Sequence, residues 1–249
     1  APMAAPLIGS YVLELWGWRS IFWTLASYAM LWSVLIVLTI PETLPQAKRL
    51  PIHPVAVGRV FAEVLSHKQA MGYTLTAAFG FAGMFAYITA TPFIYMEIYG
   101  VTPQGYALFF AANIVAMAVF SAANGRLAGR FTGHQLLTGL TWVLVAAALA
   151  VLGAGVTGIG GVWGLAVPLF LYVGSLSAVA ANGISGTLHS FGHSAGTASS
   201  VFGVFQFGLG SLTGLVVSVL NGGTVLPMVG LVVSCAVLAF ISLRTLAKP

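Results

Sequence analysis

The longest uncharged run of the sequence decides which fold classes are open to this chain. Between Phe131 and Leu243, 113 consecutive residues include no Asp, Glu, Lys or Arg. Charged residues make up 5% of the whole chain, against about a quarter in an ordinary soluble domain. A stretch of this length cannot form an aqueous surface, so it must face lipid or other helices.

Turn-forming and charged stretches divide the chain into eight hydrophobic segments. A transmembrane helix needs about 20 apolar residues, and most of the segments reach that length. A transmembrane β-strand would instead alternate polar and apolar residues over about ten positions, which these segments do not do. The predicted fold class is therefore an all-α membrane protein, with segments near 1–15, 20–40, 70–96, 105–123, 135–154, 161–182, 197–220 and 224–243.

The breaks between these segments are of two kinds. Glycine-rich stretches at 153–161, 182–196 and 221–223 predict turns between neighbouring helices. The one long break, at 41–69, is rich in proline in its first half, which predicts an extended chain there. Its second half, 57–68, is predicted to form a short surface helix.

The distribution of cations predicts the orientation in the membrane. Cytoplasmic loops of membrane proteins carry an excess of Lys and Arg. With the loop 41–69 on the cytoplasmic side, alternate loops place eight of the nine cations inside and leave only Arg19 outside, and the C-terminus is then cytoplasmic. Because these cations are spread over short loops, the net charge of +5 does not indicate a nucleic-acid surface.

Polar and aromatic side chains within the segments are the candidates for a substrate cavity. Asn113 and Gln206 lie near the middle of their segments, where each either bonds a neighbouring helix or contacts a substrate. Phe81, Tyr87 and Tyr172 are further candidates, although aromatic side chains in spans mostly face lipid or other helices. None of the four glutamates lies at mid-membrane depth, so these residues supply no evident proton carrier.

Three other patterns suggest chemistry that their context does not favour. His189 and His193 are spaced four apart like a metal pair, but no third ligand is near them in the sequence. Ser185 and His189 suggest an intramembrane serine hydrolase, although both are expected in one loop and not on separate helices. Cys235 lies in an apolar run and is expected to be a packing residue. No metal and no catalytic residue is predicted.

Several stretches carry a family resemblance. "APMAAPLIGSY" followed by "GWRSIFW" looks like an antiporter motif in a fifth helix and the entry to a sixth, and "IPETLP" looks like the exit of that sixth helix. "ATPFIYMEIYGVTPQGYALFFAANI" is similar to a seventh and eighth helix, and "HSAGTASSVFGVFQFGLGSLTG" to an eleventh. In this order and spacing they resemble the bicyclomycin-resistance (Bcr/CflA) branch of the major facilitator superfamily, drug-efflux antiporters of the bacterial inner membrane.

The resemblance implies a major-facilitator-type helical bundle of twelve helices. The chain would be a fragment of it with about eight transmembrane segments, from the end of helix 5 to helix 12. Residues 1–40 would form the end of the N-terminal half, 41–69 the central cytoplasmic loop, and 70–249 the C-terminal six-helix half. The missing helices 1–4 would carry the proton-coupling acid, and the proton gradient would replace any cofactor as the energy source.

The resemblance also assigns two motifs to residues of this chain. One motif is the second-half copy of the superfamily's cytoplasmic gating motif. It departs from the family pattern, because a glycine stands where the stronger copy carries an Asp. The alternative is that its two arginines only anchor the orientation of the helices in the membrane. The assigned positions are Pro2, Pro6 and Gly9 for the antiporter motif, and Gly125, Arg126, Gly129 and Arg130 for the gating motif.

The function predicted from these observations is proton-coupled multidrug efflux in the bacterial inner membrane, by a chain that does not transport alone. The expected partners are amphipathic drug-like substrates, the lipid bilayer and helices 1–4, without nucleic acid. Two alternatives stay open. One is a non-transporting membrane fragment of a broken reading frame, and the other is an intramembrane hydrolase that uses Ser185 and His189.

Overall fold

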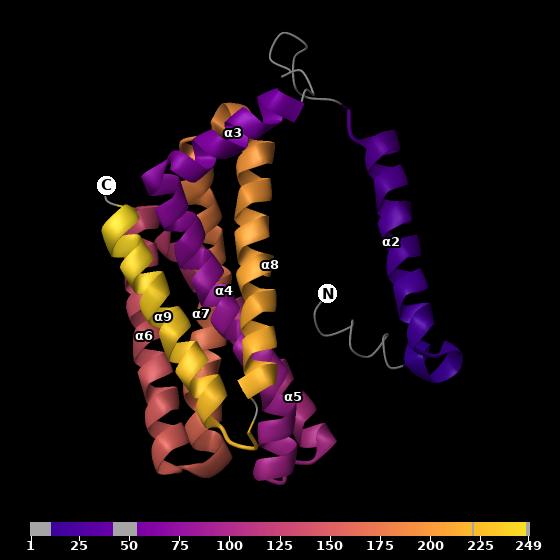
Figure 1. Ribbon diagram of the computed structural model, residues 1–249, viewed down its shortest axis with the longest axis vertical. Helices are drawn as coiled ribbons and strands as arrows, with labels where there is room; N and C mark the ends of the chain where they lie inside the picture. The colour runs from indigo at the N-terminus through magenta and orange to yellow at the C-terminus, as the bar shows by residue number, and fades with distance from the viewer. Residues whose placement is uncertain (1–10, 42–53, 221, 248–249) are drawn as a thin grey trace. The chain divides into compact units, whose positions relative to one another are not determined.

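The computed structural model describes residues 11–41, 54–220 and 222–247 (Figure 1). Contacts between residues divide the chain into two compact units, Ala1–Ala56 and Val57–Pro249. The boundary between the units therefore falls within the long break that the sequence predicts.

The described part of the first unit contains one long apolar helix, α2 (Trp18–Thr39). Gly17, with a φ of 77°, separates α2 from a short helical stretch at 11–16. The hydroxyl of Ser20, in the first turn of α2, donates a hydrogen bond to the carbonyl of Gly17. Helix α2 confirms the segment predicted near 20–40, whereas the proposed antiporter-motif positions Pro2, Pro6 and Gly9 lie outside the described residues.

The second unit is a bundle of long helices that run back and forth along one axis (Figure 1). Together with α2, seven of the described helices are long and apolar enough to cross a membrane, and they match seven of the eight predicted segments. The eighth, near 1–15, lies mostly outside the described residues. The elements of the bundle are α3 (Pro54–Ser66), α4 (Lys68–Phe93), the π-helix η2 (Ile94–Ile98), α5 (Pro103–Leu127), α6 (Gly133–Thr157), α7 (Gly161–His189), the 3₁₀ helix η3 (Gly192–Ser194), α8 (Ala195–Leu220) and α9 (Leu226–Leu246).

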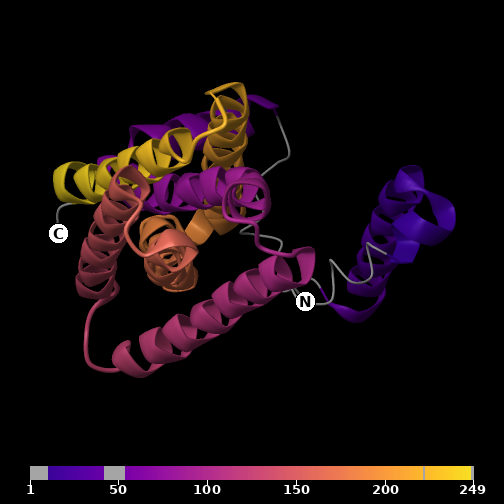
Figure 2. The same ribbon diagram turned by 90° about the horizontal axis from the view of Figure 1, so that it is seen from below.

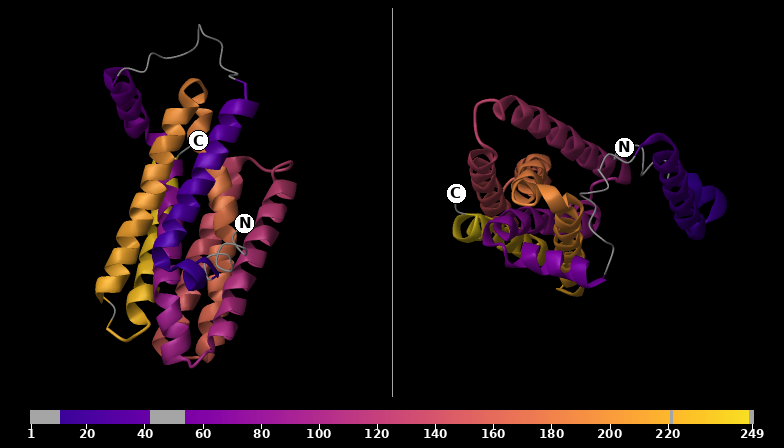
Figure 3. Two further views of the ribbon diagram at one scale, coloured as in Figure 1. Left: turned by 90° about the vertical axis from the view of Figure 1, so that its right-hand side faces the viewer. Right: turned by 90° about the horizontal axis from the view of Figure 1, so that it is seen from above.

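Helices α4 and α7 form the centre of the second unit. Helices α8 and α9 flank α4, and α5 and α6 flank α7. On one side α6 packs against α9, whereas on the other side no contact of similar extent joins α5 to α8. Views along the bundle axis show α5 at one edge of the unit, with α7 between it and α9 (Figures 2 and 3).

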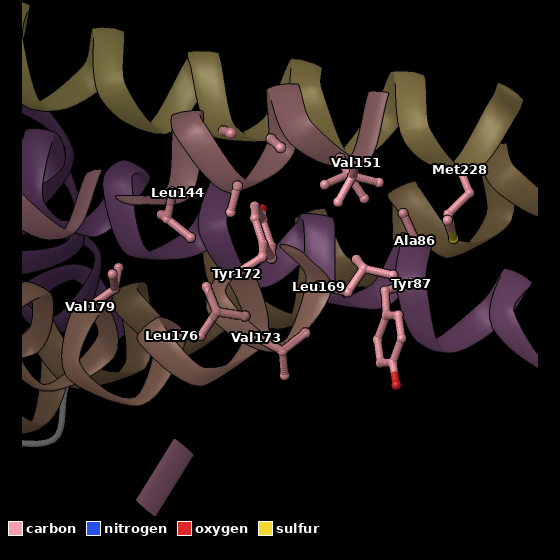
Figure 4. Packing of buried hydrophobic residues seen from close by; sticks show 14 of the residues in the cluster. Ala86, Tyr87, Leu144, Val151, Leu169, Tyr172, Val173, Leu176, Val179 and Met228 are labelled. Atoms are coloured by element: carbon pink, nitrogen blue, oxygen red, sulfur yellow. The ribbon is translucent and has the colours of Figure 1, made fainter. Parts of the chain in front are cut away.

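A large aromatic side chain fills the centre because small residues face it. Tyr172 of α7 is completely buried, and its hydroxyl donates to the carbonyl of Gly80 on α4 at 3.1 Å. A Cβ atom added at Gly83 would lie 2.8 Å from Cζ of Tyr172 and 3.3 Å from Cβ of Cys235. Figure 4 shows Tyr172 among the packed apolar side chains of the core. The glycines of α4 thus permit the close approach of α7 and α9, and Cys235 is a buried packing residue as predicted.

The glycine-rich stretch 182–196 is not the turn that the sequence predicts over its whole length. Helix α7 continues through it as far as His189. The Asn182 amide donates to the carbonyl four residues earlier at 2.8 Å, so this polar side chain is satisfied within the helix. A Cβ atom added at Gly183 would lie 2.8 Å from Cβ of Ala77. The small residues here serve close packing against α4, which overrides their preference for turns.

The turn predicted at 153–161 is confirmed in its second half. Helix α6 ends at Thr157, and Gly158 and Gly160 adopt φ values of 70° and 78°. Residues with side chains rarely adopt this conformation, so glycine is needed at the reversal between α6 and α7. The preceding glycines lie inside α6.

The short surface helix predicted at 57–68 is confirmed as α3. It packs on one end of the bundle through Val64, which is buried in a cluster with Phe191 and Ala198. His67 then begins the next helix, because its Nδ1 atom accepts a hydrogen bond from the backbone N–H of Ala70 at 3.2 Å. A residue that accepts from the first turn stabilises a helix start.

Candidate functional site

An aromatic surface lies where α4 meets α8. Phe81, Phe85, Ile88 and Thr89 share one face of α4 and are partly or largely exposed. The ring centroid of Phe81 lies 5.3 Å from that of Phe85 and 5.4 Å from that of Phe207 on α8. This surface carries no charge. Aromatic, uncharged surfaces with a few polar groups bind amphipathic small molecules.

Gln206 supplies an amide on the same helix as Phe207. It lies at the middle of α8, one residue before Phe207, and its side chain is half-buried. Within the described part of the chain it has no hydrogen-bond partner. An unpaired amide at this depth of a membrane is costly, so a partner from outside these residues is needed. A polar group of a substrate would be such a partner.

Asn113 lies at the middle of α5 and connects it to α4. Its Nδ2 atom donates to the hydroxyl of Tyr87 at 2.8 Å and to the carbonyl of Phe109 at 2.9 Å. Both Asn113 and Tyr87 are buried, and Figure 4 shows the Tyr87 hydroxyl pointing away from the apolar cluster. The Oδ1 atom of Asn113 has no hydrogen-bond partner within the described residues. The amide therefore bonds a neighbouring helix and keeps one acceptor unused.

The contact between α4 and α5 continues through residues that the sequence did not single out. The hydroxyls of Thr91 and Tyr106 lie 3.3 Å apart, and the ring of Tyr95 packs edge-on against Tyr106 with centroids 6.0 Å apart. The spacing of Tyr87, Thr91 and Tyr95, four residues each, puts them on one face of a helix and could have indicated this row. The same spacing joins Phe81 to Phe85.

Tyr172 occupies a different environment from the other predicted cavity residues. Its phenol is enclosed between α4, α7 and α9 and bonds the Gly80 carbonyl. Phe81 thus packs against Phe207, the neighbour of Gln206 on α8, whereas Asn113 and Tyr87 form a second contact and Tyr172 lies in the core.

A polar pocket of about 260 Å³ lies at the end of the bundle where α4 and α6 begin and α7 ends. The Tyr73 hydroxyl and the Nδ1 atom of His134 lie 3.1 Å apart at its wall. The Asn182 amide donates to Oδ1 of Asn124 on α5 at 2.7 Å. The first contact joins the beginning of α4 to the beginning of α6, and the second joins the last turns of α5 to α7.

Ser185 and His189 also line this pocket, and their predicted location in a loop is wrong. Both lie in the last two turns of α7, because that helix continues through the glycine-rich stretch. The side chain of His193, the second member of the predicted histidine pair, lies outside the described residues. Among the residues that the structure describes, no three His, Cys, Asp or Glu side chains gather as metal ligands would.

The residues proposed for the gating motif connect α5 to α6. Gly125 and Arg126 lie in the last turn of α5, and Gly129 and Arg130 form the tight turn after it, with the Arg130 N–H donating to the Leu127 carbonyl at 2.9 Å. All four are exposed. Helix α6 then begins with a reciprocal pair of hydrogen bonds between Thr132 and Gln135, which satisfies the first backbone donors of the helix.

Comparison with known proteins decides the family. The sequence profile of the Major Facilitator Superfamily matches residues 1–215 of this chain. This chain belongs to that superfamily. Its similarity to drug-resistance proteins supports the predicted resemblance to the Bcr/CflA branch.

Three curated relatives of this superfamily chain illustrate the similarity. It is 29% identical to a bicyclomycin resistance protein homologue of Haemophilus influenzae, over 97% of this chain and 61% of the relative. It is 32% identical to the uncharacterized MFS-type transporter YdgK of Bacillus subtilis, over 100% of this chain and 62% of the relative. It is 28% identical to a chloramphenicol resistance protein of Pseudomonas aeruginosa, over 97% of this chain and 56% of the relative. The chain thus spans about three fifths of the length of these relatives.

Membership of the superfamily agrees with the all-α membrane architecture described above. The seven apolar helices make the chain a multi-pass membrane protein. The matched relatives are named as drug-resistance proteins or as an MFS-type transporter, which disfavours the hydrolase interpretation of Ser185 and His189. The roles of the cavity and motif residues stay predictions.

Proposed function

We propose that this chain provides part of a proton-coupled multidrug efflux antiporter of a bacterial inner membrane. In this proposal residues 70–249 act as the C-terminal six-helix half, 41–69 as the central cytoplasmic loop, and 1–40 as the end of the N-terminal half. The observation that carries the proposal is the similarity, along almost the whole chain, to the bicyclomycin resistance protein homologue. Its functional partners would be helices 1–4 of such a transporter.

The substrates would be amphipathic, neutral or cationic molecules. The aromatic cluster of Phe81, Phe85 and Phe207 supplies apolar contact area. Gln206 supplies an amide that has no hydrogen-bond partner among the described residues. No acidic residue lies at the middle of any apolar segment, so the carboxylate that carries the proton would come from the other half. The orientation has the C-terminus in the cytoplasm, which is supported by the gathering of Arg126, Arg130 and Arg244 at one end of the bundle.

Co-expression with a complementary half tests the proposal. We expect that a host without its own drug exporters accumulates less of a fluorescent cationic dye when it makes this chain together with the part of the Bacillus subtilis relative that this chain does not cover. A protonophore should return the dye to the level of cells without the pair. The readout is cell-associated fluorescence over time. Low accumulation that persists with the protonophore would contradict proton coupling, and accumulation unchanged by the pair would contradict drug efflux.

Replacing Gln206 by leucine in the co-expressed pair is expected to slow dye efflux about tenfold, which corresponds to the loss of one hydrogen bond of ordinary strength. Gln206→Asn should retain part of the rate, because it keeps an amide on a shorter stem. Ser200→Ala is the matched control on the same helix, since among the described residues the exposed Ser200 hydroxyl bonds only to the carbonyl of Gly196 in its own helix. Equal efflux rates in Gln206→Leu and Ser200→Ala would show that the amide makes no contact with the dye.

A further inference from the structure

An apolar groove of about 330 Å³ lies between the end of α5 and the beginning of α6. Phe120, Leu127 and Phe131 line it from α5 and the following turn, and Leu140 and Val143 line it from α6. Almost all of its accessible wall is apolar, and Leu127 and Phe131 are 41% and 49% exposed. Because the two helices cross a membrane, apolar lipid chains are the medium that meets this groove.

Two arginines are the chain neighbours of residues that line this groove. Arg126 precedes the lining residue Leu127, and Arg130 precedes the lining residue Phe131. Both lie in the last turn of α5 or in the turn after it, at the point where the bundle ends, and both are exposed. An apolar groove and two exposed cations therefore lie at the same end of the bundle, next to one another along the chain.

The helices α5 to α9 provide no anion for these cations. The sequence contains no Asp or Glu after Glu97, so α5, α6, α7, α8 and α9 supply no carboxylate. Arg126 and Arg130 form no ion pair with any residue that the structure describes. Basic pockets beside apolar slots between transmembrane helices bind the head groups of anionic lipids.

We propose that this groove is a binding site for one anionic phospholipid. One acyl chain lies in the slot between α5 and α6, and Arg126 and Arg130 bind the phosphate at its mouth. The site requires only the membrane-spanning fold and does not depend on the proposed transport activity. It gives the exposed arginines of the α5–α6 turn a binding partner, whether or not the turn also acts in gating.

Native mass spectrometry of the purified chain in a nonionic detergent tests the proposal with dioleoyl phosphatidylglycerol as the probe. Dioleoyl phosphatidylcholine is the zwitterionic comparison. We expect one phosphatidylglycerol bound more tightly than phosphatidylcholine, and affinity reduced about fivefold by each of Arg126→Gln and Arg130→Gln. Arg244→Gln is the matched control: Arg244 lies in the last turn of α9 at the same end of the bundle, its guanidinium lies 5.3 Å from the Phe240 ring centroid, and neither it nor its chain neighbours line the groove. We expect this variant to bind like the original chain.

Filling the slot tests the acyl-chain part of the site. Gly139 lines the groove on α6, and a Cβ atom added there meets no atom within 4 Å, so Gly139→Phe can occupy the slot without disturbing the helix packing. Gly153→Phe is the control on the same helix, because Gly153 also has open space around it and does not line the groove. We expect Gly139→Phe to lose at least fivefold in phosphatidylglycerol affinity and Gly153→Phe to lose none. Circular dichroism melting confirms that both variants fold.

Three outcomes would overturn the proposal. Equal affinity for the two lipids would show nonselective contact with bulk lipid. Equal losses in Gly139→Phe and Gly153→Phe, or in Arg130→Gln and Arg244→Gln, would show that the groove is not the site. Displacement of the bound lipid by millimolar inorganic phosphate would show that the arginines bind a free anion without an acyl chain in the slot.

Discussion

Replacing Gly83 by valine is expected to abolish the packed state of the second unit. Gly83 lies on α4 at the crossing with α7 and α9, and a Cβ atom at this position would overlap the hydroxyl of Tyr172. It would also lie 2.8 Å from Cζ of Tyr172 and 3.3 Å from Cβ of Cys235. Since Tyr172 is completely enclosed, its ring cannot move aside without displacing α7.

The size of the effect follows from the cost of overpacking. Methyl groups added to a closely packed core lower the free energy of unfolding by about 1 to 3 kcal/mol where the neighbouring side chains can adjust, and by more where the backbone must shift. We therefore expect Gly83→Val to lower the free energy of unfolding by at least about 3 kcal/mol. Denaturation in detergent, followed by circular dichroism and by size-exclusion chromatography, measures this loss.

Two comparisons show whether the loss comes from this contact. Gly153→Val places the same β-branched residue in α6, where the added Cβ meets no atom within 4 Å, so it should change stability little beyond helix propensity. Gly83→Ala combined with Tyr172→Phe should be less destabilised than the sum of the single changes, because the second change removes the atom nearest to the added methyl group. A Gly83→Val melt that overlaps that of Gly153→Val would contradict the packing described here.

Expression of these 249 residues by themselves is expected to leave drug accumulation at the level of an empty vector. The second unit presents an aromatic surface at the α4–α8 contact, but its apolar segments hold no carboxylate at mid-membrane depth. Alternating access needs two bundles that move against each other around a site between them. Proton coupling also needs a group that titrates within the membrane.

The measurement is the accumulation of a fluorescent cationic dye in cells that make the chain alone. Membrane insertion must be verified in the same cells by immunodetection in the membrane fraction. Because the chain alone is expected not to export the dye, the Gln206→Leu variant and the original chain should give the same accumulation. Efflux by the chain alone, abolished by a protonophore, would contradict the expectation and would require a proton carrier within these residues.

The transmembrane architecture could be read from hydrophobicity because lipid leaves a helix few alternatives. Every backbone donor and acceptor must be satisfied within the segment, so a long apolar run is helical whatever its neighbours are. The segments near 70–96, 105–123 and 224–243 therefore match α4 with η2, α5 and α9 to within a few residues. The first of them also holds Pro92, and the helix passes directly after it into the π-helix η2, since proline removes a backbone donor.

The end of α7 shows where reasoning from local pattern failed. Asn182, Gly183 and Gly186 are residues typical of turns, yet they lie inside a helix. A Cβ atom at Gly186 would lie 2.6 Å from the Tyr73 ring, so the absence of a side chain allows the contact between α7 and α4. A glycine that breaks a helix and a glycine that allows two helices to approach look alike in a single sequence.

The sequence by itself determined that this chain crosses a membrane as apolar helices, where its charges lie, and which family it resembles, because those properties depend on composition and order along the chain. Only the tertiary structure decided what each polar or aromatic side chain contacts. Asn113 and Gln206 are both mid-span amides, yet Asn113 bonds to Tyr87 of α4, and Gln206 has no partner among the described residues. The sequence shows which residues share a face of a helix, but not which neighbouring helix that face meets. The partner of an amide is therefore known only when the neighbouring helices are placed.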